Sequence, residues 1–291
     1  MRLSTMQSAV LFMLGAAILV AGTSIMAKTL GLSGDGFEGL HAFQVSAGRY
    51  FFGFCTLLTF TLLRPAMRPS FEGTAWPVHA IRALVGWMGV TAMFAAVAAM
   101  PIAEATAISF LNPLIAMILA VMFLGENLNA KKLIAAALSI AGAVMILRPG
   151  GESFQIAGLY ALFAAICMGA EIVIVKRLTD KEPALRILLI NNLIGATIAL
   201  TAASFVWLSP TALQWGLLIL LGATMVSAQS MFVQSLKRGE ASAVSLVFYS
   251  VLVFAALYDA LFYGVIPSMI ALIGSGLIIG GAIVLAMGRR A

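Results

Sequence analysis

Long apolar runs recur along the whole chain, and they constrain its fold more than any other feature of the sequence. Ten runs are rich in aliphatic residues and poor in charge, near residues 8–27, 40–63, 83–100, 105–124, 131–147, 156–175, 187–208, 213–236, 241–263 and 268–288. A helix that crosses the hydrocarbon core of a bilayer needs roughly 20 residues. Only 10% of the residues are charged, against about 25% in soluble proteins. We therefore expect an all-α membrane protein of ten transmembrane helices.

Basic residues fall on alternate connections between these runs. If both termini are cytoplasmic, the cytoplasmic segments hold 14 Lys and Arg residues and the opposite segments hold 2, Lys28 and Arg148. The positive-inside rule describes this distribution. We therefore expect a multi-pass protein of the bacterial inner membrane with both termini in the cytoplasm. The net charge of +6 arises in these loops, so the expected partner is the lipid bilayer and not a nucleic acid.

The two halves of the chain share short matches that keep their order. EATAIS at 104–109 is similar to EASAVS at 240–245, and Gly142 and Gly281 lie at matching places in the fifth and tenth runs. We assign residues 1–149 and 150–291 to two five-helix repeats, with chance similarity of Ala-rich helices as the alternative. Five crossings are an odd number, so the second repeat would insert upside down. Inverted repeats of this kind are typical of secondary transporters, which bind substrate between the repeats.

The segment that begins at Met100 carries the most specific pattern in the chain. MPIAEATAISFLNPL at 100–114 and FLGE at 123–126 resemble the signature segment of EamA-type transporters, which belong to the drug/metabolite transporter superfamily. Arg49 and Tyr50 in the second run fit the same resemblance. It implies a carrier of small organic solutes, often an exporter of amino acids. It also leaves open an uptake carrier for a cofactor-like solute such as S-adenosylmethionine or riboflavin.

Three charged residues stand out inside the apolar runs: Arg49, Glu171 and Asp259. Each costs at least about 2.5–3.5 kcal/mol at a helix centre on insertion scales, so each calls for a partner or a function. We expect Arg49 to form an ion pair within the bundle, with a substrate carboxylate as the alternative partner. Glu171 and Asp259 lie close to the ends of their runs. There we expect hydrated interfacial acids, with ion coupling as the alternative.

A proline and several polar residues mark the fourth and ninth runs as the expected substrate site. Pro113 removes a backbone hydrogen bond and frees a carbonyl one turn earlier. Ser109 and Asn112 lie beside this break, and Ser245 and Tyr249 share one face of the ninth run. We therefore expect the substrate between these two runs near the membrane midplane. Further candidate substrate-binding residues are Trp87, Gln229, Arg49 and Gln44.

Small residues recur at four-residue spacing in the fifth and tenth runs. The tenth contains Gly276 and Gly280, and the fifth contains Ala135, Ser139 and Ala143. Such faces allow membrane helices to approach closely. We expect the fifth and tenth helices to pack against each other, with dimerisation as the alternative, so the protein would be a monomer or a homodimer.

Motifs that support catalysis are missing from this sequence. The chain has two histidines, and no nucleophile elbow, phosphate-binding loop or cluster of metal-ligand residues is recognisable. We expect no catalytic residue, no metal and no cofactor. The leading hypothesis is a secondary transporter for a small-molecule substrate, most often an amino acid or metabolite exporter. A membrane enzyme or a structural membrane subunit is the remote alternative.

Overall fold

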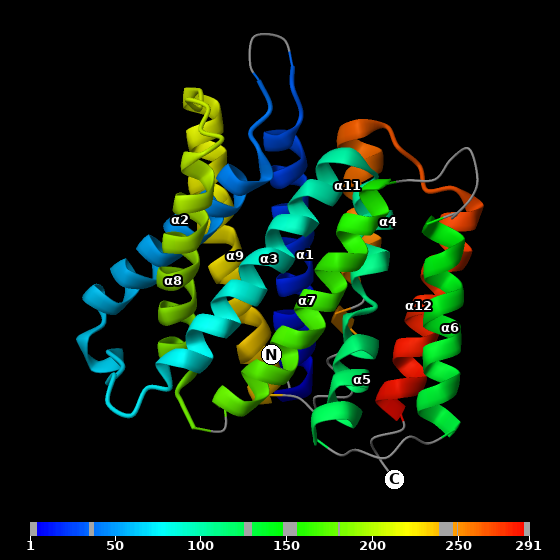
Figure 1. Cartoon of the computed structure of the whole chain (residues 1–291), viewed down its shortest axis with the longest axis horizontal. Helices are drawn as coiled ribbons and strands as arrows, with labels where there is room; N and C mark the ends of the chain where they lie inside the picture. Colours follow the sequence, from blue (N-terminus) through cyan, green and yellow to red (C-terminus); the bar gives the residue numbers. More distant parts are fainter. Residues whose placement is uncertain are drawn as a thin grey trace.

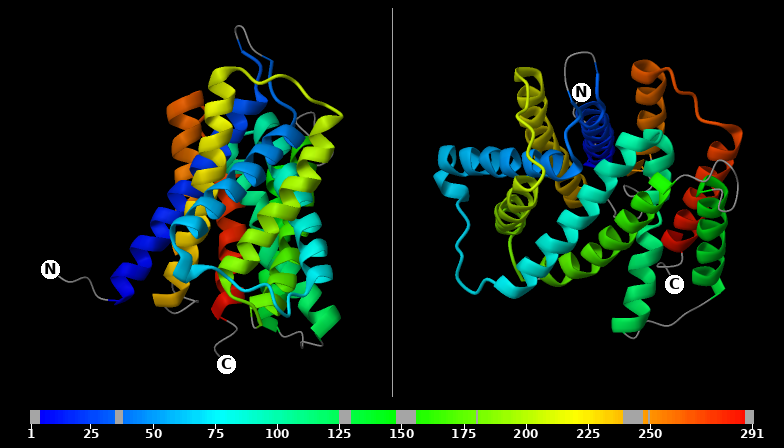
Figure 2. Two further views of the ribbon diagram at one scale, coloured as in Figure 1. Left: turned by 90° about the vertical axis from the view of Figure 1, so that its left-hand side faces the viewer. Right: turned by 45° about the horizontal axis from the view of Figure 1, so that its top comes forward.

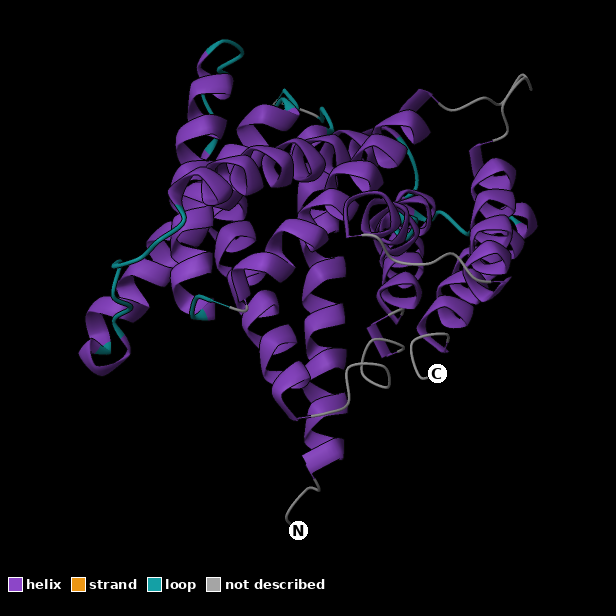
Figure 3. Cartoon of the chain, turned by 60° about the horizontal axis from the view of Figure 1, so that its bottom comes forward, coloured by secondary structure: helices purple, strands orange, loops and turns teal. Residues whose placement is uncertain are grey.

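The structure is a computed structural model that describes residues 5–34, 38–124, 130–147, 156–179, 181–238, 247–248 and 250–287. The secondary-structure elements of this part of the chain are helices (Figure 3). Their bounds are α1 (Thr5–Gly31), α2 (Ala42–Leu63), η1 (Pro65–Met67), α3 (Trp76–Ala99), α4 (Ile102–Ser109), α5 (Asn112–Leu124), α6 (Ala130–Leu147), α7 (Ile156–Thr179), α8 (Ala184–Ser204), α9 (Ala212–Arg238), α11 (Ser250–Tyr263) and α12 (Met269–Met287).

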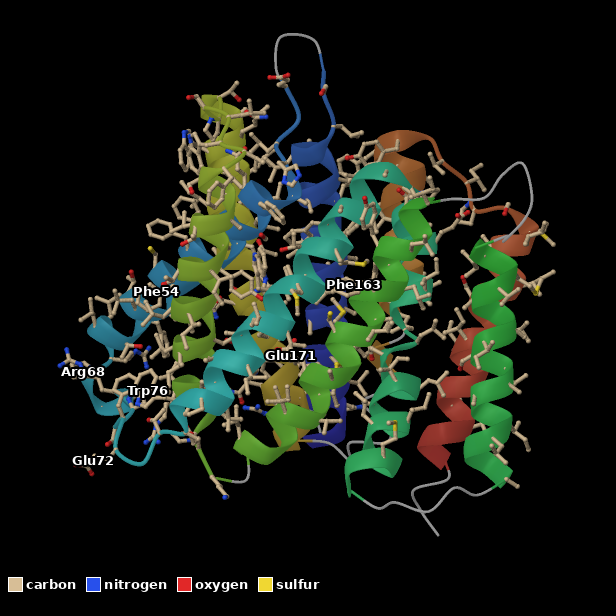
Figure 4. All side chains as sticks on the ribbon, viewed as in Figure 1. Phe54, Arg68, Glu72, Trp76, Phe163 and Glu171 are labelled. Carbon is tan, nitrogen blue, oxygen red and sulfur yellow. The ribbon has the colours of Figure 1, made fainter. Side chains whose placement is uncertain are left out.

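Six of these helices are long and apolar enough to cross a membrane by length and composition. They are α1, α2, α3, α7, α8 and α9, with apolar spans of 20 to 25 residues. Large apolar side chains cover the outside of the bundle, as Phe163 does on α7, where it is 45% exposed (Figure 4). Lipid is the solvent that suits such a surface. The chain is therefore a multi-pass helical membrane protein.

The fourth apolar run is interrupted, as Pro113 predicts. The run forms α4 and α5, which are separated at Phe110 and Leu111. Pro113 has no N–H to donate to the Ser109 carbonyl, so the helix ends before it and restarts with Pro113 in the first turn, where proline is tolerated. The prediction of an interruption is confirmed. The interruption separates α4 from α5, which are two of the helices that line the central cavity described below.

The connections between helices lie at two opposite ends of the bundle. The start of α1, the end of α12, η1 and residues 181–183 lie at the end drawn lowest in Figure 1, which we call the lower end. Residues 205–211 and 264–268 lie at the upper end (Figures 1 and 2). Basic residues Arg64, Arg68 and Lys181 are therefore at the lower end, whereas Lys28 is near the upper end.

Helices of the first half pack mainly against helices of the second half. α1 packs along α9, α3 packs along α7, and α2 packs against α8 and α9. α6 and α12 pack against each other and stand to one side of the other helices (Figure 1). The core is therefore shared between the two halves of the chain.

Helices α6 and α12 meet through glycines, as the small-residue pattern predicts. A Cβ at Gly142 would collide with the backbone of Gly274, and one at Gly274 would press on Ile146. The prediction that the fifth and tenth helices pack together is confirmed. The contact uses Gly274, however, because a Cβ at Gly276 or Gly280 would meet open space.

Candidate functional site

A cavity of about 220 Å³ lies inside the bundle. Its walls come from α1, α2, α3, α4, α5, α7, α9 and α11, so both halves of the chain enclose it. The polar residues that line this central cavity are Thr23, Ser24, Arg49, Thr106, Ser109 and Asn112. The apolar ones are Val20, Val90, Met93, Phe94, Phe110, Met168, Met225, Phe248 and Val251.

Arg49 is the ionisable side chain of this lining, and it lacks a counter-ion within the described part of the chain. It is 4% exposed. Its Nε and Nη1 atoms have no hydrogen-bond partner among the described residues. Its Cζ lies 4.0 Å from the centroid of the Tyr50 ring. A cation–π contact of this kind offsets only part of the cost of burying a guanidinium.

The Tyr50 ring is held in place by a close approach of α2 and α8. Tyr50 is 1% exposed, and a Cβ at Gly195 of α8 would collide with its ring. Because Gly195 has no side chain, the ring fits flush against α8. This packing fixes the surface on which the Arg49 guanidinium lies and so holds the cation at the cavity wall.

The interruption between α4 and α5 brings hydroxyl and amide groups to the same cavity. The Ser109 hydroxyl donates to the Thr106 carbonyl at 2.7 Å. Thr106 Oγ1 is buried without a hydrogen-bond partner among the described residues. Asn112, the first residue of α5, also lines the cavity. The site therefore combines one buried cation with polar groups that can accept or donate hydrogen bonds to a bound solute.

A second polar group, the upper cluster, lies between the cavity and the upper end of the bundle. It consists of Lys28, Asp259, Tyr263 and the Ala103 backbone. Lys28 Nζ lies 3.0 Å from Asp259 Oδ1 and 4.5 Å from the centroid of the Tyr263 ring. Asp259 Oδ2 accepts a hydrogen bond from the Ala103 N–H at 3.0 Å. Ala103 is in the first turn of α4, where a carboxylate pairs with a free N–H and the positive end of the helix dipole.

The upper cluster ties three cavity-lining helices together. Lys28 belongs to α1, Asp259 to α11 and Ala103 to α4. Lys28 lies one helical turn beyond Ser24 on α1, and Asp259 lies about two turns beyond Val251 on α11. The Lys28 and Asp259 side chains are 9% and 1% exposed. The cluster therefore closes the bundle on the upper side of the cavity.

An ion pair toward the lower end joins α3 to α7. Arg82 Nη2 lies 3.1 Å from Glu171 Oε1, and Arg82 Nη1 donates to the Ile187 carbonyl at 3.3 Å. Figure 4 labels Glu171 where α7 runs beside α3. This pair satisfies the carboxylate of Glu171 outside the central cavity.

Glu182, in the connection between α7 and α8, forms a compact cluster at the lower end. Its carboxylate accepts the Ala75 N–H at 3.1 Å and lies 3.0 Å from His79 Nε2 and 3.7 Å from Arg186 Nη1. Burial alone would raise the pKa of Glu182. The hydrogen bonds from Ala75 and His79, together with the charges of His79 and Arg186, outweigh burial and lower this pKa below its usual value.

Three of the residues predicted to bind substrate meet at the central cavity: Arg49, Ser109 and Asn112. The backbone of Pro113 lies beside Asn112 in the first turn of α5. Ser245 and Tyr249, which we predicted on the facing helix, lie outside the described residues. The described residues therefore contain the α4–α5 side of the predicted site and not its second side.

The other three predicted substrate residues are not among the residues that line the central cavity. The Trp87 indole N–H donates to Ser46 Oγ at 3.2 Å. The Gln44 amide donates to the Leu208 carbonyl at 2.7 Å and accepts the Leu208 N–H at 3.1 Å. Gln229 Oε1 is buried without a partner among the described residues. The structure thus gives Gln44 a different role, which is to fasten α2 to the connection before α9.

One expectation about the embedded charges needs correction, and one embedded charge finds no partner among the described residues. Asp259 is not a hydrated interfacial acid, because both of its oxygens are used in the upper cluster. Arg49 does not form the expected ion pair with any carboxylate of the described residues. Glu171 is ion-paired, although its side chain remains 24% exposed.

Lys28 was missed as a membrane-embedded residue because the first apolar run is shorter than the helix it forms. The run predicts a span that ends at residue 27, whereas α1 continues to Gly31. The Met and Phe side chains that line the cavity carry no distinguishing sequence signal, since such residues are common throughout the chain. Within the described residues, no three His, Cys, Asp or Glu side chains gather as metal ligands would.

The sequence matches the EamA-like transporter family twice, over residues 7–148 and 155–287. An S-adenosylmethionine uptake transporter of Rickettsia bellii is 29% identical over 89% of this chain and 86% of its own length. A pseudopaline exporter of Pseudomonas aeruginosa is 24% identical over 81% of this chain and 83% of its own. A riboflavin transporter of Rhizobium johnstonii is 28% identical over 82% and 80%. With both halves matched and a cavity enclosed by helices of both halves, the chain belongs to the EamA-like transporter family.

Proposed function

We propose that the protein is a secondary transporter that carries a small organic metabolite through the central cavity by alternating access. The observation that supports this most is the cavity itself. It is enclosed by helices of both halves and contains an embedded cation without a counter-ion among the described residues. Embedded charges that face a cavity mark substrate or ion pathways in membrane proteins.

Two inverted five-helix repeats, residues 1–149 and 150–291, would explain how the helices pair. α1 packs along α9, and α7 packs along α3. If each half contributes five crossings, these two contacts exchange when the halves exchange, as a pseudo-twofold axis requires. α2 with α8 and α6 with α12 are then pairs of equivalent helices. This supports ten crossings, with α4 and α5 forming one, and it supports inversion of the second repeat.

The orientation we propose has both termini in the cytoplasm of a bacterium and the upper end outside the inner membrane. Arg64, Arg68 and Lys181 lie at the lower end, with the start of α1 and the end of α12 (Figure 1). Cytoplasmic loops carry the excess of Lys and Arg. The upper cluster then closes the cavity toward the outside.

Transport would require the upper cluster to open and close. Lys28, Asp259 and the Ala103 N–H join α1, α11 and α4, so separating these helices breaks the ion pair and the hydrogen bond together. Protonation of Asp259 would weaken both, which would make this residue the coupling acid. Export of an amino acid or related metabolite is the direction we favour. Uptake of a cofactor-like solute is the second candidate, because one relative is named as an uptake transporter.

Exchange across liposomes tests this function directly. Purified protein would be reconstituted into vesicles loaded with one amino acid, organic acid, nucleoside or vitamin at a time, and the uptake of the labelled solute would be followed. We expect labelled solute to accumulate only in vesicles that hold the same unlabelled solute. If no solute of the four classes exchanges faster than in protein-free vesicles, the proposal is wrong.

A further inference from the structure

We propose that the transported solute carries a carboxylate and that Arg49 binds this group in the central cavity. This inference rests on the proposed transport function and adds the chemical class of the substrate. It takes the cavity as the place where the solute is held and Arg49 as the residue that selects it.

Arg49 differs from the other buried cations of the bundle. The described residues contain four buried Lys or Arg side chains: Lys28, Arg49, Arg82 and Arg186. Lys28 pairs with Asp259, Arg82 with Glu171 and Arg186 with Glu182. Arg49 alone among these four has no carboxylate partner within the described part of the chain. Since the chain supplies a carboxylate to each of the others, the missing partner at Arg49 is best explained by a group that arrives with the substrate.

The Arg49 guanidinium has N–H donors without hydrogen-bond partners among the described residues. Arg49 Nε carries one N–H and Nη1 carries two, and neither nitrogen has a partner among the described residues. A guanidinium binds planar carboxylates through parallel N–H donors, and these charge-assisted bonds are roughly twice as strong as neutral ones. The Tyr50 ring covers part of the guanidinium. Arg49 lines the cavity, and its Nε and Nη1 have almost no exposed surface in this state, so a ligand reaches these two donors only when the side chains around the guanidinium move.

The charge of the cavity sets the charge of the ligand. Arg49 supplies one positive charge, and the other described lining residues supply none. A phosphate monoester carries about −1.5 to −2 charges at pH 7 and would remain partly uncompensated. A carboxylate carries one negative charge, which Arg49 neutralises. The site therefore favours carboxylates over phosphorylated metabolites.

The rest of the lining indicates what the carboxylate is attached to. Apart from three valines, six apolar side chains line the cavity: Met93, Phe94, Phe110, Met168, Met225 and Phe248. Burial of an apolar body against them is favourable. The cavity of about 220 Å³ is smaller than the roughly 300–1,000 Å³ of pockets for drug-sized ligands. In this state it suits a small organic acid or an apolar amino acid, with Thr106 Oγ1 as a further hydrogen-bonding group.

Binding of matched acids and amides tests the inference on the unmodified protein. We would measure binding of 4-methylpentanoate, 3-phenylpropanoate, leucine and phenylalanine, each beside its primary amide, to purified protein in lipid nanodiscs. We expect at least one acid to bind about ten- to hundred-fold more tightly than its amide, because the amide loses the charge-assisted bonds. If no acid binds more tightly than its amide, the inference is wrong.

Variants then assign the discrimination to Arg49. Arg49→Gln should bind acid and amide equally, whereas Arg49→Lys should retain part of the preference. The double variant Arg82→Gln/Glu171→Gln is the matched control, because it removes a buried arginine together with its counter-ion and neither residue lines the cavity. It should keep the full preference for the acid. If Arg49→Gln discriminates as the parent does, another group binds the carboxylate and the assignment to Arg49 fails.

The outcomes separate this inference from the transport function. Exchange of a solute without a carboxylate across liposomes, with equal binding of that solute to the parent and to Arg49→Gln, would leave transport intact and overturn the carboxylate inference. Preferential binding of an acid without exchange of any solute would support the site and overturn transport. If Arg49→Gln does not fold, the acid and amide measurements on the parent protein decide the question.

Discussion

Lys28 and Arg49 are two buried cations of the same helical bundle, and they differ in their polar partners. Lys28 Nζ donates to the Met100 carbonyl at 3.4 Å, whereas Arg49 Nε and Nη1 have no hydrogen-bond partner among the described residues. The two cations are 7% and 4% exposed, and each lies against an aromatic ring, Tyr263 for Lys28 and Tyr50 for Arg49. Lys28 also has a carboxylate at 3.0 Å. Arg49 has none among the described residues. Burial alone therefore does not distinguish a structural charge from a functional one, whereas the presence or absence of a counter-ion does.

The difference follows from what each charge does for the helices around it. Asp259 compensates Lys28 and also pairs with the first turn of α4, so the charges hold α1, α4 and α11 in one arrangement. Among the described residues, Arg49 holds no helix to another through an ion pair. A buried charge without a counter-ion persists only where the surrounding packing fixes it, and here the contact between Tyr50 and Gly195 provides that packing.

Removing the counter-ion of Lys28 should produce the largest effect on stability. Asp259→Asn keeps an oxygen that can accept the Ala103 N–H but leaves Lys28 buried without an anion. We expect a loss of about 3–5 kcal/mol, the usual result of breaking a buried ion pair by removing one partner. The measurement is thermal unfolding of the purified variant and parent in the same detergent.

The double variant Lys28→Met/Asp259→Asn is the control for this prediction. It removes the unpaired ammonium as well, so most of the lost stability should return, since replacing both members of a buried pair is often neutral. A double variant as unstable as Asp259→Asn would mean that the carboxylate acts through α4 and not through Lys28. An Asp259→Asn variant as stable as the parent would remove the distinction between the two cations.

Glu182 sharpens the comparison because its charges lie outside the membrane-spanning segments, at the lower end. Its lowered pKa means that ionised Glu182 stabilises the fold above its unfolded-state pKa of about 4.3. This stabilisation should decline as the pH falls below that value and vanish below the lowered pKa of the folded state. We expect Glu182→Gln to lower stability by about 1–3 kcal/mol near neutral pH.

The same substitution should flatten the acid side of the stability profile. Melting temperatures of the parent and Glu182→Gln would be recorded from pH 7 to pH 3, and the difference between the two profiles should narrow as the pH falls. Parallel profiles over that range would show that protonation of Glu182 does not govern the loss of stability in acid.

The sequence predicts the helical membrane fold well because hydropathy and charge act over whole segments. The ends of α6, the start of α7 and the break at Pro113 follow from apolar runs and from the missing proline N–H. The end of α1 does not, because Lys28 looks like a loop residue when its counter-ion is unknown. Asp259 is 231 residues away along the chain, and only the folded bundle brings the two together.

Prediction of the candidate site was partial for the same reason. Arg49, Ser109 and Asn112 are chemically conspicuous in an apolar sequence, and all three line the cavity. Gln44 is equally conspicuous, yet its amide pairs with the Leu208 backbone. A polar side chain in an apolar run shows that something must satisfy it. Whether that is the backbone, another side chain or a substrate depends on contacts between helices that the local sequence does not specify.

Replacing Arg49 itself should have the smallest effect on stability, which contrasts directly with Asp259→Asn. Arg49→Met exchanges the guanidinium for an unbranched apolar side chain that can fill the same space. The variant loses a cation–π contact with Tyr50, worth about 0.5–2 kcal/mol, and is relieved of the desolvation cost of an unpaired charge. These two terms oppose each other, so the net change should stay within about 1 kcal/mol of the parent. Thermal unfolding in the same detergent checks this.

An acid that binds the parent should raise its melting temperature in proportion to the logarithm of ligand concentration at saturation. It should leave the melting temperature of Arg49→Met unchanged. A loss as large as that of Asp259→Asn would mean that Arg49 is a structural charge like Lys28.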